Sequence, residues 1–221
     1  MKPLLITIDG PSGAGKTTTS RLLAHRLDYR YIDTGALYRG VALAAISTGL
    51  TPDDDPALEK LCSTLKMEFM PGEKGLRLIS NGSDVTDQIR TPEISMFASA
   101  VSARPVVRHF LLDLQRHLGR EKKAVFEGRD MGTVVFPDAD VKFFLDASPK
   151  TRALRRYQEL KSVNPQTLDA VERDMRRRDE NDSTRNLAPL KPAEDAIRID
   201  STDLSVEAVV DRMLTVIENI L

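Results

Sequence analysis

The sequence predicts an α/β fold in which a five-stranded parallel sheet is flanked by helices. Five short apolar runs end in polar or charged residues, helical patterns separate them, and a glycine-rich stretch directly follows the first run. Such alternation favours a parallel sheet with right-handed crossover connections. Ligands of these sheets gather at the carboxyl ends of the strands, so we expect the functional residues there.

The five runs have the length and the β-branched or aromatic content of buried strands. They read LLITID, YRYIDT, AVFEGRD, VKFFLDAS and AIRIDST. A carboxylate stands at or just past each end, and these carboxylates are Asp9, Asp33, Glu127, Asp130, Asp146 and Asp200. A different pattern, with short alternating segments and glycine turns, occupies Met67 to about Val85 and predicts a small antiparallel ribbon inserted into the core.

The stretch after the first run fits the phosphate-binding pattern of glycine, four free positions and Gly-Lys-Thr. It consists of Gly10, Pro11, Ser12, Gly13, Ala14, Gly15, Lys16 and Thr17. Its glycines allow backbone N–H groups to turn inward around a phosphate at a helix N-terminus. In this pattern Lys16 reaches the β- and γ-phosphates and Thr17 a magnesium ion. A merely glycine-rich turn is the alternative, but a strand precedes the stretch and a helical stripe of leucines follows it.

Length and composition limit the possible classes of protein. A chain of 221 residues suits one substantial core with a small insertion. The 32 basic and 33 acidic residues leave a net charge of -1, so we expect neither a nucleic acid nor a membrane as partner. Cys62 is the only cysteine, which suits a reducing compartment. No apolar run has the length of a membrane span, and we expect a cytoplasmic protein.

An arginine-rich segment, RDMRRRDENDSTRN, lies near the C-terminal end of the chain. On a continuous helix Arg178, Asp182 and Arg185 would share one face, because they are spaced by four and three residues. A solvated salt-bridge ladder is one interpretation. A lid that closes over phosphates is the other, since a loop with two prolines follows and two phosphorylated substrates need several cations.

A monophosphate as the phosphoryl acceptor would explain why the sequence shows no evident catalytic base, because a monophosphate is already mostly dianionic at neutral pH. The three histidines, His25, His109 and His117, therefore need no catalytic role and are expected to be structural or solvent-facing. The Asn-Lys-x-Asp stretch that reads guanine in GTP switches is absent from the sequence.

Six motifs carry a resemblance to one family. IDGPSGAGKT, DTGALYR, EGRDMGTVVFPDA, KFFLDAS, RRDENDSTRNLAPLKPA and IDST occur in the order and nearly the spacing of bacterial-type cytidylate kinases, which the chain resembles almost end to end. The resemblance implies transfer of a phosphoryl group from ATP to CMP or dCMP with magnesium. It also implies a P-loop nucleoside-monophosphate-kinase fold, with a core at about 1–66 and 120–221, an acceptor-binding insertion at about 67–119 and a lid at about 173–192.

The resemblance also implies the site residues. The ATP site is residues Gly10 to Thr18, with Thr18 included, and Lys16, Arg178 and Arg185 are the catalytic residues. The acceptor site is Thr34, Arg39, Ser99, Arg108, Arg129, Asp130, Arg178 and Asp182, of which Asp182 is a candidate for a sugar hydroxyl. Magnesium would contact Thr17 and, through water, Glu127.

Three positions depart from the family pattern. Many relatives have Gly-Lys-Gly-Thr where this chain has Lys16-Thr17-Thr18, so either threonine is a candidate for the magnesium hydroxyl. Thr34 replaces a usual serine and keeps the hydroxyl, and Glu127 replaces a usual aspartate.

Arg129 and Asp130 offer both signs of charge directly after a strand. A cytosine would use both, because its amino group donates while its N3 and O2 accept. A core salt bridge is the alternative interpretation of this pair.

Two other functions remain open from sequence. One is a small-molecule kinase of the same fold that acts on UMP, dTMP or shikimate, and the other is a module that binds ATP without turnover. As partners of the expected kinase we predict the small-molecule substrates ATP and CMP or dCMP, and we expect a monomeric protein.

Overall fold

A computed structural model describes residues 2–73, 75–161 and 166–220 of the chain. Its backbone packs as two compact units, which we describe separately. The first unit comprises Met1–Tyr31 and Glu121–Leu221, and the second comprises Ile32–Arg120. The second unit thus contains the expected insertion at 67–119 and, in addition, residues 32–66.

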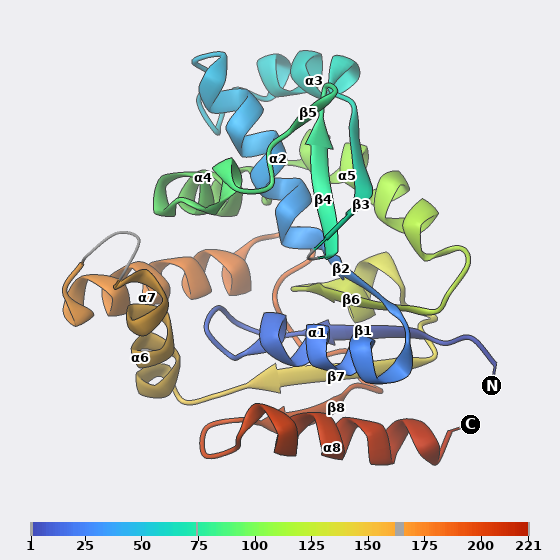
Figure 1. The fold of residues 1–221 in the computed structure, drawn as a ribbon. Coiled ribbons are helices and arrows are strands. Elements are labelled where there is room, and N and C mark those ends of the chain that lie inside the picture. Colours follow the sequence, from blue (N-terminus) through green and yellow to red (C-terminus); the bar gives the residue numbers. More distant parts are fainter. Residues whose placement is uncertain (1, 74, 162–165, 221) are drawn as a thin grey trace. The chain divides into compact units, whose positions relative to one another are not determined.

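The five-stranded sheet has the order β2-β6-β1-β7-β8 (Figure 1). Its strands are β1 (Leu5–Asp9), β2 (Arg30–Asp33), β6 (Ala124–Gly128), β7 (Val141–Asp146) and β8 (Ile197–Asp200). β1 pairs in parallel with β6 and β7, and β7 pairs in parallel with β8. All five predicted strands are confirmed, and the fully buried β1 is central, as its continuous apolar run requires.

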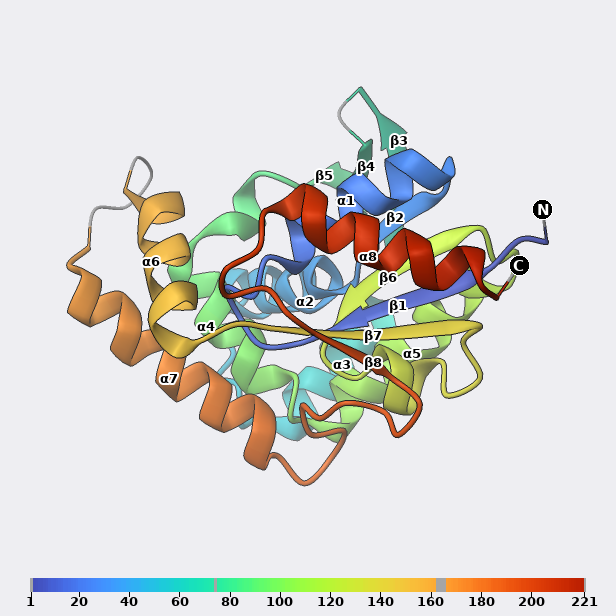
Figure 2. The ribbon, with the colours of Figure 1, turned by 90° about the horizontal axis from the view of Figure 1, so that it is seen from below.

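Helices α1 (Lys16–Leu27) and α8 (Val206–Glu218) pack on the sheet of the first unit. Leu23 of α1 and Val210 and Met213 of α8 are fully buried in the same apolar cluster as the strand residues. Figure 2 shows α8, in red, running along the strands. This packing fixes the N-terminus of α1 beside the carboxyl end of β1.

Helices α6 (Pro149–Leu160) and α7 (Leu168–Thr184) lie side by side in Figures 1 and 2, and together we call them the arm. Ala153 and Leu160 of α6 pack against Val171 and Met175 of α7. Ser148 and Thr167 cap the two N-termini by accepting backbone N–H bonds, as expected at these positions. α7 ends at Thr184, so Arg185 is extended backbone (φ -62°, ψ 139°) and does not continue the helix that the spacing suggested.

The second unit is mainly helical. Its elements are α2 (Thr34–Ser47), α3 (Asp55–Thr64), β3 (Met67–Gly72), β4 (Gly75–Ser80), β5 (Ser83–Asp84), η1 (Gln88–Arg90), α4 (Pro92–Val101) and α5 (Pro105–Gly119). The three strands form a separate antiparallel sheet, which confirms the predicted ribbon. Leu37, Val41, Leu58 and Leu111 are fully buried in one core.

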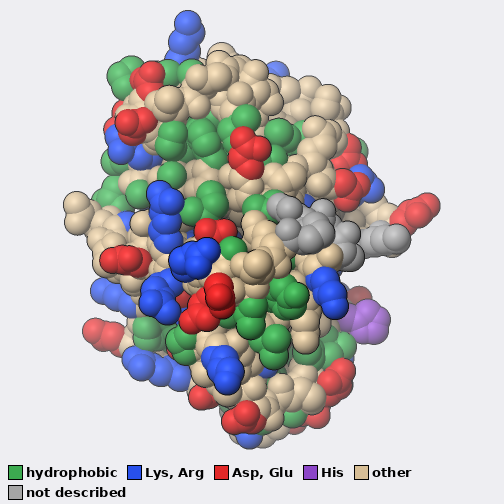
Figure 3. Space-filling view, turned by 90° about the vertical axis from the view of Figure 1, so that its left-hand side faces the viewer, with side chains coloured by type: hydrophobic (Ala, Val, Ile, Leu, Met, Phe, Trp, Pro, Cys, Tyr) green, Lys and Arg blue, Asp and Glu red, His purple; other side chains and the backbone are tan. Residues whose placement is uncertain are grey.

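Charged side chains of both signs lie next to one another on the face shown in Figure 3, in keeping with the net charge of -1. His25, His109 and His117 are all exposed, as the sequence predicted. Among the described residues, no helix combines the length and the apolar character that crossing a membrane requires.

Candidate active site

The phosphate loop, residues 10–15, joins β1 to α1. Gly10, Gly13 and Gly15 have φ of 151°, 75° and 89°, a region that other residues rarely enter. A Cβ on Gly10 would lie 1.9 Å from the carbonyl oxygen of Leu145, so glycine is required there. No side chain caps the N-terminus of α1, which leaves its first N–H groups for a ligand.

Lys16 folds back over this loop. Its Nζ donates to the carbonyl of Pro11 at 2.7 Å, and the residue is 4% exposed. Burial lowers the pKa of Lys16 to about 7, and the nearby Arg129 contributes in the same direction. An incoming phosphate would favour the charged form of this amine, as a phosphate-binding lysine requires.

Glu127, at the end of β6, faces the start of α1. Its Oε1 accepts from the Thr17 hydroxyl at 2.9 Å and its Oε2 from the Tyr31 hydroxyl at 2.5 Å. Thr18, by contrast, is exposed. A hydroxyl and a carboxylate are hard oxygen ligands, so the pair Thr17 and Glu127 fits magnesium, which binds few protein groups and keeps several waters. No cluster of three potential metal-binding side chains occurs in the part of the chain described.

Two ion pairs connect the end of β6 to α7 and the residue after it. Arg129 Nε donates to Asp182 Oδ2 at 3.0 Å, and Arg185 Nη2 lies 3.5 Å from Asp130 Oδ1. The side chains of Arg185 and Asp130 are only 4% and 3% exposed. Burial acts to raise the pKa of Asp182, but the neighbouring arginines, Arg129 foremost, hold it below its usual value.

The arginine-rich segment therefore divides into two kinds of residue. Arg176 is 78% exposed and forms a surface ion pair with Glu172 one turn earlier at 3.3 Å. Asp182 and Arg185 instead turn into the protein. The loop after α7 folds back on the helix, because Leu190 N donates to the carbonyl of Asp182 at 2.7 Å.

Asp9 organises the turn that follows Asp130. Its two carboxylate oxygens accept from the backbone N–H groups of Met131 and Gly132 at 2.9 and 2.8 Å. These residues open the short π-helix η2 (Met131–Val135). Burial raises the pKa of Asp9 to about 6. The sequence placed Asp9 at a strand end but gave it no role, since its partners are distant in the chain.

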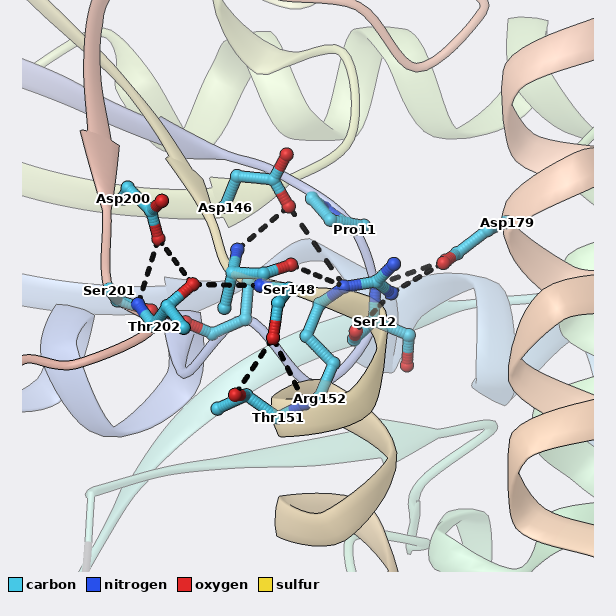
Figure 4. Close-up of polar contacts among 12 residues, drawn as sticks. Pro11, Ser12, Asp146, Ser148, Thr151, Arg152, Asp179, Asp200, Ser201 and Thr202 are labelled. Atoms are coloured by element: carbon cyan, nitrogen blue, oxygen red, sulfur yellow. Dashed lines mark hydrogen bonds and ion pairs between the residues drawn. The ribbon is translucent and has the colours of Figure 1, made fainter. Parts of the chain in front are cut away.

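Arg152 and Asp179 are further residues near the phosphate loop that the sequence did not predict. Both contact Ser12 of the phosphate loop, and Arg152 pairs with Asp179 (Figure 4). Their only sequence signal is a position in helices rich in charge, which does not separate them from surface residues.

Arg178 lies on α7 in the first unit, where its charge helps to hold the pKa of Asp182 down. Thr34, Arg39, Ser99 and Arg108 belong to the second unit. Arg39 Nη2 donates to Asp33 Oδ2 at 2.8 Å, and Arg108 lies over the ring of Tyr38 at 5.9 Å. Arg108 also donates to the carbonyl of Ser102 at 3.2 Å. Thr34 and Ser99 are buried, at the start of α2 and in the second half of α4.

Comparison with known proteins gives a consistent family. The family model described as cytidylate kinase matches residues 6–219. A cytidylate kinase of Geobacter sulfurreducens is 55% identical over 97% of this chain and 92% of its own length. Those of Syntrophotalea carbinolica and Pseudomonas aeruginosa are 49% and 48% identical, over 98% and 95% of this chain and 92% and 93% of their own lengths.

Solved structures agree on the fold. A shikimate kinase of Acinetobacter baumannii, determined with shikimate, has a TM-score of 0.51 at 16% identity, covering 99% of this chain and 94% of its own. At such low identity this likeness concerns the fold alone. The extent and level of the sequence matches, however, leave one conclusion: the chain belongs to the cytidylate kinase family.

Proposed function

We propose that this protein transfers the γ-phosphoryl group of ATP to CMP or dCMP, giving ADP and CDP or dCDP. The observation that carries the proposal is the match to the cytidylate kinase family over residues 6–219. The phosphate loop with its buried lysine and the paired acidic and basic residues after β6 support it.

The phosphate loop is proposed to hold ATP through residues Gly10 to Thr18. Lys16 would exchange its bond to the Pro11 carbonyl for the β- and γ-phosphates. Arg178 and Arg185 would then offset charge on the phosphoryl group in transfer. The site needs no base for a monophosphate dianion, so catalysis consists of placement in line, charge stabilisation and exclusion of water.

The acceptor residues are assigned by the motifs they occupy. In the first unit these are Arg129, Asp130, Arg178 and Asp182, and in the second unit Thr34, Arg39, Ser99 and Arg108. Asp130 suits the cytosine amino group and Arg129 the cytosine acceptors. Asp182 is proposed for a sugar hydroxyl, and its bond with Arg129 keeps its carboxylate ionised and oriented for that contact.

Magnesium is proposed to bind at Thr17, with Glu127 contacting it through water. When bound, the ion would offset the negative charge of the ATP phosphates. The protein's own contribution is the fixed geometry of the two oxygen ligands, since Tyr31 holds Glu127 from its other oxygen. We favour Thr17 over Thr18 as the magnesium ligand, because the Thr17 hydroxyl contacts Glu127 whereas Thr18 is exposed.

We also propose that the protein acts as a monomer in the cytoplasm, where its donor ATP is made and used. Size-exclusion chromatography with light scattering measures the molar mass in solution, which should be that of one chain, 24.6 kDa.

The test of the activity is ADP release from magnesium-ATP with CMP, dCMP, UMP, AMP, dTMP and shikimate as acceptors. We expect release with CMP and dCMP well above that with the others. Faster release with UMP, dTMP or shikimate would indicate another kinase of the same fold. ATP binding without release from any acceptor would indicate a non-catalytic nucleotide-binding module.

A further inference from the structure

The backbone of Ser12 in the phosphate loop is held at its N–H and at its carbonyl by residues of the arm. Arg152 Nη1 donates to the Ser12 carbonyl at 3.0 Å, and Asp179 Oδ1 accepts a long hydrogen bond from the Ser12 N–H at 3.4 Å. Arg152 and Asp179 are also paired with each other, so the three residues close a ring of contacts (Figure 4).

Arg152 is itself fixed in place. It is buried, and its Nε donates to the carbonyl of Ala147 at 3.0 Å, just before α6 begins. The start of α6 is held in turn, because Ser148 caps the helix and its N–H donates to the Thr202 hydroxyl at 2.8 Å. A planar guanidinium with several fixed donors suits this task, whereas the single ammonium of lysine does not.

The next loop residue shows that the arm and the loop interlock. A Cβ on Gly13 would lie 2.7 Å from the carbonyl oxygen of Arg152 and 2.8 Å from Cε of Met175. One of these atoms belongs to α6 and the other to α7. Both helices of the arm therefore rest against the loop, with no room for a side chain at residue 13.

We propose that Arg152 and Asp179 are positioning residues for the ATP phosphates: the two side chains fix the peptide groups on either side of Ser12 and tie the orientation of the phosphate loop to helix α7. Neither residue touches the reacting atoms in this proposal. The inference rests on the proposed ATP site, and it adds two residues that the motif assignment does not contain.

The placement of the pair predicts a selective effect. Asp179 and Asp182 lie three residues apart on α7, and each binds an arginine of the first unit. Asp179 attaches α7 to the phosphate loop through Arg152. Asp182 attaches the same helix to Arg129, the residue before Asp130. Loss of the first pair should loosen the loop and leave the second docking contact in place.

The test uses Asp179→Asn, Arg152→Lys and the double variant, with Glu172→Gln as the control. Glu172 forms an ion pair with Arg176 on the same helix, and that pair is exposed. Steady-state assays give kcat and both KM values for each variant. Amide hydrogen exchange of peptides covering residues 10–17 is measured without nucleotide, and thermal unfolding checks that each variant is folded.

We expect each single variant to raise the KM for ATP at least about fivefold while the KM for CMP changes less than about twofold. Exchange in the loop peptide should become faster, and the double variant should be no worse than the more affected single variant, because the contacts form one unit. Glu172→Gln should match the wild type in both measurements.

Folded variants with unchanged loop exchange and an unchanged ATP KM would overturn the proposal. Equal increases of both KM values with unchanged exchange would also overturn it, because they indicate a general weakening of the arm. The exchange measurement needs no turnover, so it still decides the inference if the wild type shows no CMP-dependent ADP release and the proposed function fails.

Discussion

Lys16 and Glu127 illustrate how buried charged residues of the site are stabilised before a ligand binds. Each is buried, and each is satisfied by partners that a phosphate or a hydrated ion could replace: a carbonyl for Lys16 and two hydroxyls for Glu127. Burial of a charged group without such partners would cost several kcal/mol, so these bonds maintain the site before substrate arrives.

Replacement of Lys16 by methionine should lower the turnover number for phosphoryl transfer by at least about 10²-fold and leave the fold intact. Methionine fills nearly the same volume but donates no hydrogen bond to a phosphate, and loss of one such donor costs about 10²-fold to 10³-fold in turnover. CMP-dependent ADP release and circular dichroism measure the two effects together. Turnover near that of the wild type in a folded variant would remove Lys16 from the site.

The two threonines after Lys16 can be separated by a matched pair of variants. Thr17→Val should raise the magnesium concentration for half-maximal ADP release by about tenfold or more, the range found when the ligand sphere of a metal is disturbed. Thr18→Val should leave it unchanged, because Thr18 is exposed and Thr17 contacts Glu127. A Thr18→Val effect larger than that of Thr17→Val would reverse the assignment.

Asp130→Asn should lower catalytic efficiency with CMP and narrow the preference for CMP over UMP by at least about tenfold, or about 1.4 kcal/mol. A carboxylate accepts from the cytosine amino group and repels the O4 of uracil, whereas an amide serves either base.

Asp130 lies 3.5 Å from Arg185, so the variant also alters an ion pair. If orientation of that arginine is the only role of Asp130, efficiency falls equally with both acceptors and the ratio stays constant. The ratio of efficiencies for CMP and UMP therefore decides between a base-reading role and a positioning role.

At the scale of elements, helix α7 combines a solvated face and a docked face. Arg176 and Glu172 form an exposed pair, of a kind worth about 0.3–0.5 kcal/mol. Asp179 and Asp182 bind buried or partly buried arginines on the other face. The helix ends before Arg185, and the extended backbone there turns this side chain toward Asp130.

Arg185→Ala should lower kcat by about 10³-fold with only a few-fold change in either KM, because an arginine at a transferring phosphoryl group acts mainly in the transition state. Arg176→Ala is the control from the same segment, since that side chain is 78% exposed. If Arg185→Ala changes thermal stability and leaves kcat near that of the wild type, its role is the ion pair with Asp130 alone.

At the scale of the whole molecule, the features that depend on local sequence were predictable. The five strands follow from apolar runs, the antiparallel ribbon from its glycine turns, and the phosphate loop from its spacing. The extent of the second unit does not follow from local sequence. Residues 32–66 contribute helices to it, and the partners of these helices are determined by tertiary packing. The ion pairs of Asp130, Asp179 and Asp182 also join residues far apart, and sequence alone does not show which face of α7 is docked.

The free energy of unfolding should depend on pH in a way that reflects the raised pKa of Asp9. Burial keeps this carboxyl protonated in the native state up to about pH 6, whereas the unfolded chain loses the proton near its ordinary pKa of 3.8. Between these values the native state binds more protons, so the contribution of Asp9 to the free energy of unfolding falls as pH rises. The difference between about 6 and 3.8 corresponds to a loss of about 3 kcal/mol, which is complete above about pH 6.

Asp9→Asn should therefore lose stability relative to the wild type by an amount that shrinks as pH rises from about 4 to about 6. At low pH both side chains are neutral, whereas above about pH 6 the wild type alone carries a buried charge. Asparagine still accepts from one of the N–H groups of Met131 and Gly132 but offers an amide N–H to the other, a mismatch that costs about 1–3 kcal/mol at every pH. Urea unfolding of wild type, Asp9→Asn and the exposed control Asp174→Asn at several pH values measures the difference. A constant gap between wild type and Asp9→Asn across this range would show that Asp9 titrates alike in the folded and unfolded states, and that its role is confined to holding the turn after Asp130.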